Sequence, residues 1–201
     1  MANTALITGA NRGIGLELCF QLKDKSWEVI AACRKTTPEL DQLGVRVETG
    51  VEVTSEEAVS GLARRLEGVR LDLLVNNAGI LTRESLEDLD YERIRRQFEV
   101  NALGPLRVVH ALLPSLGQGS KVILITSRMG SIGDNTSGTR YGYRMSKAAL
   151  NMAGVSLAHD LKSRGIAVAI LHPGFVRTGM TNFEGFIDPP EATAGLVARI
   201  E

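Results

Sequence analysis

The sequence predicts a single α/β domain, with one doubly wound parallel sheet of the Rossmann type and helices on both faces. Strand-like and helix-like segments alternate through the 201 residues without a linker or repeat. The first strand-like segment runs directly into a glycine-rich turn and then into a helical pattern. Later strand candidates such as 71–75 and 122–125 are almost continuously apolar, which is typical of strands covered on both faces. A chain of this length suits one domain, 1–201.

The expected elements follow one another in strict alternation. The first strand, 4–8, is an apolar run, and an apolar 3–4 spacing after the glycine turn gives the first helix, 14–25. The remaining strands are expected at 28–33, 45–50, 71–75, 121–126 and 166–171. The remaining helices are expected at 54–67, 89–116, 143–164 and 190–200. This order implies right-handed crossovers between parallel strands.

Composition narrows the classes of partner. The 23 basic residues balance the 23 acidic ones, so neither nucleic acid nor a membrane is expected as a partner. Cys19 and Cys33 both lie in apolar patterns and are interpreted as buried small hydrophobes in a reducing compartment. A strand that begins at Thr4 leaves no room for a signal peptide, and no apolar run reaches membrane-spanning length. We expect a cytoplasmic protein with no metal site.

The segment from Thr8 to Gly15 has the features of a dinucleotide-binding turn. Gly9 permits the tight turn, Gly13 allows the backbone to approach a pyrophosphate, and Gly15 allows close packing of helix on strand. The pyrophosphate would bind at the N-terminus of the following helix. Three residues, rather than one, separate the first two glycines, so a plain glycine turn is the alternative.

Tyr143 and Lys147 lie one helical turn apart, with Ser127 sixteen residues before the tyrosine. A phenol exchanges protons at neutral pH only if its pKa falls by about three units, which requires about 4 kcal/mol of preferential stabilisation of the phenolate. A lysine at i+4 lies on the same helix face and can supply the positive charge. A serine hydroxyl from another segment could polarise a carbonyl oxygen.

Polar segments follow three of the expected strands. They are 76–79 after the strand ending at Val75, Thr126 and Ser127 after Ile125, and 172–178 after Leu171. Each is also a plausible turn. Because ligands of doubly wound sheets bind beyond the carboxyl ends of the strands, their joint occurrence beside the glycine turn favours one shared site.

Five ordered motifs make the chain resemble the classical short-chain dehydrogenases/reductases over essentially its whole length. They are T-G-x-x-x-G-I-G at 8–15, N-N-A-G at 76–79, Asn-Ala-Leu-Gly at 101–104, Ser127 with Tyr143 and Lys147, and P-G-x-V-x-T at 173–178. The residues around these motifs resemble the branch that contains sniffer-type carbonyl reductases and the bacterial C-factor. The chain ends at Glu201, before the last C-terminal strand that family members usually have.

The resemblance implies a role for each catalytic candidate. Tyr143 would be the general acid for carbonyl reduction, and Ser127 would hold the substrate oxygen. Lys147 would bind the nicotinamide ribose and lower the pKa of the tyrosine. Asn101 would hold a water that links Lys147 to solvent, unless it is merely a polar residue that kinks a long helix.

The resemblance also implies NADP(H) as the cofactor. Thr178 would hold the nicotinamide carboxamide, and Asn77 would steady the adenine side. No acid follows the second strand, where a ribose-binding carboxylate would stand, so Arg34 and Arg12 are expected to bind a 2′-phosphate. The expected cofactor-binding residues are Gly9, Asn11, Arg12, Gly13, Ile14, Gly15, Arg34, Glu52, Val53, Asn77, Ala78, Gly79, Tyr143, Lys147, Pro173, Gly174, Val176 and Thr178. Glu52 stands where the family often has an aspartate.

The predicted function is transfer of a hydride between NADP(H) and a small-molecule carbonyl or secondary alcohol. The alternative is an NADP(H)-binding signalling protein of the C-factor type, in which catalysis is secondary. The substrate walls are expected from the loops 80–86, 128–141 and 179–190. Candidates for wall or core positions are Met129, Tyr141 and Phe175, while His172 and Trp27 are read as structural.

The resemblance further implies a homo-oligomer, with a dimer favoured over a tetramer. Helices 89–116 and 143–164 carry more apolar positions than one sheet face requires, and the family commonly pairs these helices across a two-fold axis. The apolar positions considered are Leu106, Val109, Leu112, Leu150, Val155 and Leu157.

Overall fold

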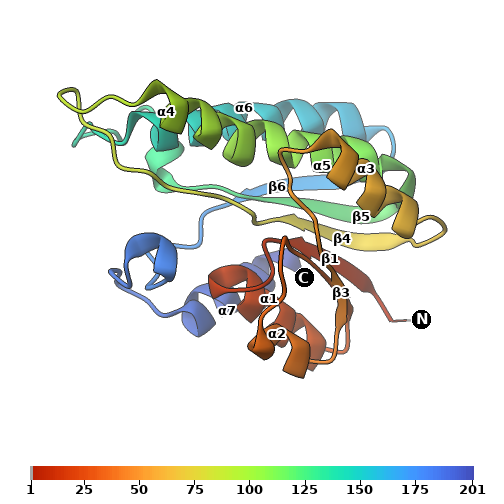
Figure 1. Ribbon diagram of the computed structural model, residues 1–201. Helices are drawn as coiled ribbons and strands as arrows, with labels where there is room; N and C mark the ends of the chain where they lie inside the picture. The colour runs from red at the N-terminus through yellow and green to blue at the C-terminus, as the bar shows by residue number, and fades with distance from the viewer. Residues whose placement is uncertain (1) are drawn as a thin grey trace.

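The computed structural model describes residues 2–201 and confirms the doubly wound parallel sheet. Six strands hydrogen-bond in the order β3-β2-β1-β4-β5-β6, and every pairing is parallel (Figure 1). The strands are β1 Thr4–Thr8, β2 Glu28–Ala32, β3 Arg46–Glu48, β4 Leu71–Asn76, β5 Leu116–Ile125 and β6 Ala167–Leu171. The order reverses between β1 and β4, which places the switch point beside the glycine turn.

Helices cover both faces of the sheet. On one face lie α1 (Gly13–Asp24), α2 (Pro38–Gln42) and α7 (Pro189–Ile200); Figure 1 shows them below the strands. On the other face lie α3 (Glu56–Arg65), α4 (Tyr91–Phe98), α5 (Gly104–Leu112) and α6 (Tyr141–Lys162). Each layer encloses its own buried apolar cluster, which includes Ile7 and Val75 on the α1 side and Leu6 and Leu74 on the α6 side. Alternate strand residues therefore serve the two cores.

The helical run expected at 89–116 is present from 91 to 115, but it is not one uniform α-helix. Between α4 and α5 the chain widens into a π-helical turn, Glu99–Leu103, and after α5 it closes in a short 3₁₀ turn, Leu113–Ser115. Pro105 has no backbone N–H to donate to the preceding turn, so a departure from the α-helical hydrogen-bond pattern is expected near this point. Asn101, which is fully buried, lies inside the π turn.

Other boundaries differ by a few residues. The structure adds α2, which the sequence analysis missed although Thr37 caps it by accepting a hydrogen bond from Leu40 N and Pro38 opens it. The strand expected at 45–50 is shorter, and the one expected at 121–126 begins earlier, at Leu116. Trp27, Cys19 and Cys33 all lie in or against the core, as expected.

Five of the six apolar residues proposed for the oligomer contact divide into two groups, and the sixth, Leu157, is partly buried against the core. Val109, Leu112 and Leu150 are at most 1% exposed and belong to the core, so the expectation that they meet another subunit is wrong. Leu106 and Val155 are 41% and 49% exposed. Many apolar positions of these helices are buried against the sheet, because α5 and α6 pack directly on it.

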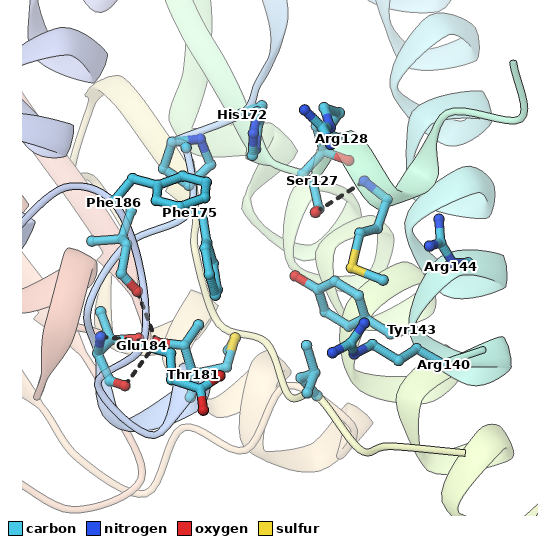
Figure 2. Close-up of a pocket in the computed structure, with 18 of the residues that line it drawn as sticks. Ser127, Arg128, Arg140, Tyr143, Arg144, His172, Phe175, Thr181, Glu184 and Phe186 are labelled. Atoms are coloured by element: carbon cyan, nitrogen blue, oxygen red, sulfur yellow. Dashed lines mark hydrogen bonds between the residues drawn. The ribbon is translucent and has the colours of Figure 1, made fainter. Parts of the chain in front are cut away.

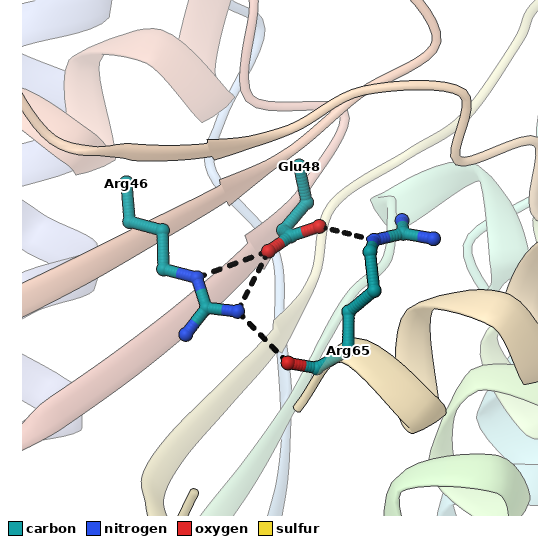
Figure 3. A network of polar contacts seen from close by, with 3 residues as sticks. All are labelled: Arg46, Glu48 and Arg65. Atoms are coloured by element: carbon teal, nitrogen blue, oxygen red, sulfur yellow. Dashed lines mark hydrogen bonds and ion pairs between the residues drawn. The ribbon is translucent and has the colours of Figure 1, made fainter. Parts of the chain in front are cut away.

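An ion-pair network fastens β3 to α3. Glu48, which is 7% exposed, accepts hydrogen bonds from Arg46 Nη2 at 2.8 Å and from Arg65 Nε at 2.5 Å (Figure 3). Burial acts to raise the pKa of Glu48, but the hydrogen bonds and charges of Arg65 and Arg46 outweigh it and lower the pKa. The short edge strand is thereby held to the helix that follows it.

No helix among residues 2–201 combines the length and the apolar character needed to cross a bilayer.

Candidate active site

The glycine turn has the close packing that the sequence predicts. Gly9 adopts φ +66°, and a Cβ there would lie 2.9 Å from Ala78 Cα. A Cβ on Gly15 would overlap the carbonyl oxygen of Gly9 and the side chain of Asn77. Asn77 Nδ2 donates to Thr8 O at 3.0 Å and to Gly9 O at 3.2 Å. Gly15 and Asn77 thus hold the turn against the end of β4.

A cleft of about 190 Å³ lies over this turn at the carboxyl edge of the sheet. Twelve of the residues expected to bind the cofactor line it: Gly9, Asn11, Arg12, Gly13, Ile14, Arg34, Glu52, Val53, Asn77, Ala78, Gly79 and Thr178. Seven further residues line it, and of these only Ile80, Gly179 and Met180 lie in loops that were expected to form part of the site; the others are Cys33, Val51, Arg96 and Val100. No short motif contains most of these, because strand and helix packing brings them to the cleft.

The cleft is electropositive. Arg12, Arg34 and Arg96 line it against a single carboxylate, Glu52. Arg34 Nη1 lies 3.5 Å from Glu52 Oε2, and both side chains are substantially exposed, so this pair is weak and the arginine stays available to an anion. The first turn of α1 contains no acidic residue, which leaves its free N–H groups to the cleft as well.

Ser127 and Tyr143 lie together, from different elements. Ser127 follows β5, and its Oγ accepts a hydrogen bond from Met129 N at 3.2 Å. Tyr143 lies in the first turn of α6, is 8% exposed, and has its hydroxyl toward Ser127 (Figure 2). The two hydroxyls can therefore address the same substrate oxygen.

The expected lowering of the Tyr143 pKa is wrong for this structure. Burial raises the pKa of Tyr143 above its ordinary value, and the Ser127 hydroxyl opposes that shift only in part. Lys147 Nζ lies 5.8 Å from the centre of the tyrosine ring and donates to Ile125 O at 2.8 Å. Burial lowers the pKa of Lys147 to about 8. The i+4 spacing places Lys147 near the tyrosine ring but does not reveal the cost of burying both groups.

Asn101 converges with Lys147 on one point of the backbone. A Cβ on Gly79 would lie 3.3 Å from Asn101 Oδ1 and 3.8 Å from Lys147 Nζ. The Asn101 amide is engaged, since Oδ1 accepts from Ile80 N at 2.9 Å and Nδ2 donates to Ile80 O at 2.9 Å and Ser146 Oγ at 3.0 Å. Its side chain therefore ties the loop after β4 to α6, and the expected water relay stays a prediction.

A larger cavity of about 580 Å³ adjoins the hydroxyl pair. Leu81, Met129, Phe175, Val176 and Phe186 give it apolar walls. Phe175 and Phe186 pack edge to face, with ring centres 5.5 Å apart. All three loops expected to form the substrate walls contribute to it, whereas Tyr141 does not line it.

The two cavities meet at Ile14, Thr178 and Met180, which line both. Pro173, Gly174 and Val176 line the larger cavity rather than the cleft where the sequence analysis expected them. Gly15, Asn101 and Lys147 line neither and act from behind the walls. The two cavities therefore adjoin, and the serine and tyrosine lie in the larger one.

His172 borders the larger cavity, although the sequence analysis read it as structural. Partial burial and the nearby Arg128 charge lower its pKa, so the ring is neutral at pH 7.

A buried carboxylate that the sequence analysis missed fixes the start of α6. Glu84 is 2% exposed; its Oε1 accepts from Thr82 Oγ1 and from Gln97 Nε2 at 3.0 Å, and its Oε2 accepts from Gly142 N at 3.3 Å. Gly142 must be glycine there, because a Cβ would overlap the Gln97 amide. Glu84 therefore positions the helical turn that carries Tyr143.

Among residues 2–201, no group of three or more His, Cys, Asp and Glu side chains could hold a metal ion.

Comparison with known proteins identifies the relatives of this chain. The family model described as short chain dehydrogenase matches residues 3–185. A 1-hydroxy-2-glutathionyl-2-methyl-3-butene dehydrogenase from Rhodococcus sp. (strain AD45) is 47% identical over 205 residues, covering 99% of this chain and 91% of that protein. The C-signal of Myxococcus xanthus is 46% identical over 134 residues, covering 65% of this chain and 81% of that protein.

Solved structures agree with the sequence relatives. The NADPH-bound carbonyl reductase from chicken fatty liver superimposes with a TM-score of 0.90 at 30% identity, covering 99% of this chain and 91% of that one. The carbonyl reductase Sniffer of D. melanogaster gives a TM-score of 0.92 at 30% identity, covering 100% and 92%. These matches confirm the predicted branch of the family.

Proposed function

Because the chain belongs to the short-chain dehydrogenase/reductase family, we propose that it is an NADP(H)-dependent oxidoreductase that interconverts a carbonyl compound and a secondary alcohol. The observation that carries this proposal is the position of Ser127 and Tyr143 in a cavity that adjoins the electropositive cleft. A binding protein has no need for a buried phenol and serine hydroxyl at the junction of two cavities.

The cleft fits NADP(H). Its glycine turn leaves room for a pyrophosphate at the N-terminus of α1, and Arg12, Arg34 and Arg96 supply charge for a 2′-phosphate. Thr178, shared by both cavities, stands where the cleft opens toward Tyr143. When bound, the cofactor supplies the hydride for reduction or accepts it in oxidation.

Side chains of the protein supply and stabilise the transferred proton. In reduction, Tyr143 donates its phenolic proton to the carbonyl oxygen, while the Ser127 hydroxyl donates a hydrogen bond to the same oxygen. The resulting phenolate is buried, so it depends on the Lys147 charge 5.8 Å from the ring centre. In the oxidative direction Tyr143, as the phenolate, accepts the proton of the alcohol hydroxyl, and Ser127 remains hydrogen-bonded to the same oxygen.

The test is turnover of reactive small carbonyls, such as diketones and quinones, with saturating NADPH. Wild-type protein should consume NADPH, and Tyr143→Phe should lose most turnover while keeping its NADPH affinity, because only the hydroxyl is removed. Lys147→Met should also lose most turnover, since it removes the charge that lies 5.8 Å from the centre of the Tyr143 ring. Tyr141→Phe is the matched control, because Tyr141 opens the same helix without lining either cavity.

A second candidate function is an NADP(H)-binding signalling protein, which the 46% identity to the C-signal of Myxococcus xanthus favours. A signalling protein would bind NADPH without consuming it, and Tyr143→Phe would leave its biological activity intact. If wild-type protein saturated with NADPH reduces none of these carbonyls, the oxidoreductase proposal gives way to this one.

A further inference from the structure

The arginines that line the larger cavity differ in their pairing. Arg83 lies 3.8 Å from Glu184 and Arg128 lies 2.8 Å from Asp134, and both arginines are exposed at the rim. These two pairs use the only carboxylates among the cavity's lining residues within 2–201. They leave no net charge at the rim.

Arg140 and Arg144 are different, because they are half-buried and have no carboxylate partner within the described part of the chain. They lie one helical turn apart, on either side of Tyr143 in the sequence, and Figure 2 shows Arg140 beside the Tyr143 ring and Arg144 further along α6, with Phe175 on the opposite side of the cavity. The nearby carboxylate of Glu84 is already committed to Thr82, Gln97 and Gly142.

The two unpaired guanidinium groups are also held in different ways. Arg144 Nε donates to Gly138 O at 3.0 Å and Thr139 O at 3.2 Å, and its Nη2 donates to Ser137 Oγ at 2.9 Å, which fixes the side chain and leaves Nη1 free. The Arg140 guanidinium makes no hydrogen bond with residues 2–201, although its backbone N donates to Glu84 O at 2.7 Å. Arg144 is therefore held in position, whereas Arg140 keeps all its guanidinium N–H donors available.

The backbone at this point is unusual. Gly138, Thr139 and Arg140 have φ of +62°, +55° and +50°, a left-handed run that glycine tolerates and the other two do not favour. Such conformations persist where surrounding contacts impose them and they cluster at ligand sites. Here the run turns the chain into α6 with Arg140 at the cavity wall.

Resting on the proposed function, we infer that the substrate carries a carboxylate, which Arg140 and Arg144 bind while Ser127 and Tyr143 hold its carbonyl or hydroxyl. A guanidinium presents paired N–H donors that match a carboxylate, and a partly dehydrated site strengthens such bonds. The apolar walls, including Leu81, Met129 and Phe175, accept the body between the two polar ends. The substrate class is thus an amphiphilic carbonyl acid or hydroxy acid.

The kinetic test uses 4-acetylbenzoate and its methyl ester, which share a ketone and a ring but differ in charge. With NADPH, wild-type protein should show a kcat/KM at least 10-fold higher for the acid. Arg140→Gln and Arg144→Gln should each lower kcat/KM for the acid about 10-fold or more, and change that for the ester less than about 3-fold. Melting temperatures of both variants confirm that they are folded.

Arg83→Gln is the control, because it removes the same charge from the rim but from an arginine that already has a partner. We expect it to change kcat/KM for acid and ester by the same factor, so that the preference for the acid is retained. If Arg83→Gln harms the acid as much as the two α6 variants do, recognition is a general field effect and the inference is overturned.

A binding measurement separates this inference from the proposed function. Calorimetry of 4-(1-hydroxyethyl)benzoate and its methyl ester with NADPH-saturated protein needs no turnover, because an alcohol and the reduced cofactor cannot react with each other. Tighter binding of the acid, lost in Arg140→Gln, supports the inference even if neither ketone is reduced, a result that would count against the oxidoreductase proposal alone. Equal binding, or tighter binding of the ester, overturns the carboxylate inference and leaves the reductase proposal standing.

Discussion

At the scale of single residues, the site balances buried charge against buried hydroxyl groups. Tyr143 stays protonated through the neutral range because burial raises its pKa, so it is a ready proton donor but a costly phenolate. Lys147, whose pKa burial lowers to about 8, offsets that cost only while it is charged. Proton transfer therefore depends on the ionisation state of the lysine.

This balance predicts a pH dependence for reduction. Lys147 carries its charge below its pKa of about 8 and loses it as the pH rises through that value. Since the charge stabilises the phenolate left by proton donation, kcat for reduction should fall above pH 8. The measurement is a pH–rate profile from pH 6 to 10 with NADPH saturating. A flat profile across pH 7 to 9 would contradict the proposed role of Lys147.

The cofactor cleft predicts a preference for NADPH over NADH. Arg34 is exposed and only weakly paired with Glu52, so it can bind a 2′-phosphate by charge-assisted hydrogen bonds. Arg34→Gln should weaken NADPH binding about 10-fold and barely change NADH binding. Fluorescence titration of both cofactors checks this, with the exposed Arg64→Gln on α3 as control. Equal affinity of wild-type protein for the two cofactors would refute the assignment.

At the scale of elements, the start of α6 carries most of the site. The N-cap residue Arg140 has no side-chain cap, and Glu84 instead accepts from Gly142 N while it holds Gln97 of α4. The π turn adds a second tie, because Asn101 hydrogen-bonds Ser146 on the same helix. Two buried side chains from neighbouring segments therefore set the position of Tyr143.

Glu84→Ala should destabilise this junction by about 2–4 kcal/mol, because it leaves the Gln97 amide and Gly142 N without a partner in a buried place. It should lower kcat more than it weakens NADPH binding, since the glycine turn lies on other elements. Thermal melts and steady-state kinetics test both effects. Glu87→Ala, an exposed carboxylate of the same loop, should change neither. An unchanged kcat in Glu84→Ala would show that α6 is positioned without Glu84.

The sequence could predict those functional residues that lie in short motifs, but not those that helix packing brings to the site. Ser127, Tyr143 and the glycine turn lie in short motifs whose order along the chain implies the sheet edge they share. Glu84, Arg96 and Arg140 could not be found that way, because their roles depend on helix packing and on a left-handed loop that leaves no periodic pattern. The predicted lowering of the Tyr143 pKa was wrong for the same reason, since the i+4 spacing reveals the charge of Lys147 but not the burial of the two side chains.

At the scale of the whole molecule, apolar surface remains on the outer side of α6. Met145, Met152 and Val155 are 50%, 68% and 49% exposed, and their spacing places them on one face of the helix. The core already uses Val109, Leu112 and Leu150, so a subunit contact would have to use these residues and Leu106 instead. We propose a homodimer through this face.

Sedimentation equilibrium at micromolar concentration should give a dimer for wild-type protein and a monomer for Met152→Glu, because a buried unpaired carboxylate is costly. Ser60→Glu places the same charge on the exposed side of α3 and should remain dimeric. A wild-type monomer at all concentrations would refute this proposal.

Transfer of a hydride from NADPH to a carbonyl carbon, with the proton from Tyr143, is the central claim. It is tested most directly by supplying NADPH deuterated at the transferable position of the nicotinamide and analysing the alcohol by mass spectrometry. We expect wild-type protein to form an alcohol with one deuterium on the carbinol carbon, and Tyr143→Phe to bind the cofactor normally but form almost none. Alcohol without deuterium, or undiminished deuterium transfer by Tyr143→Phe, would contradict the account.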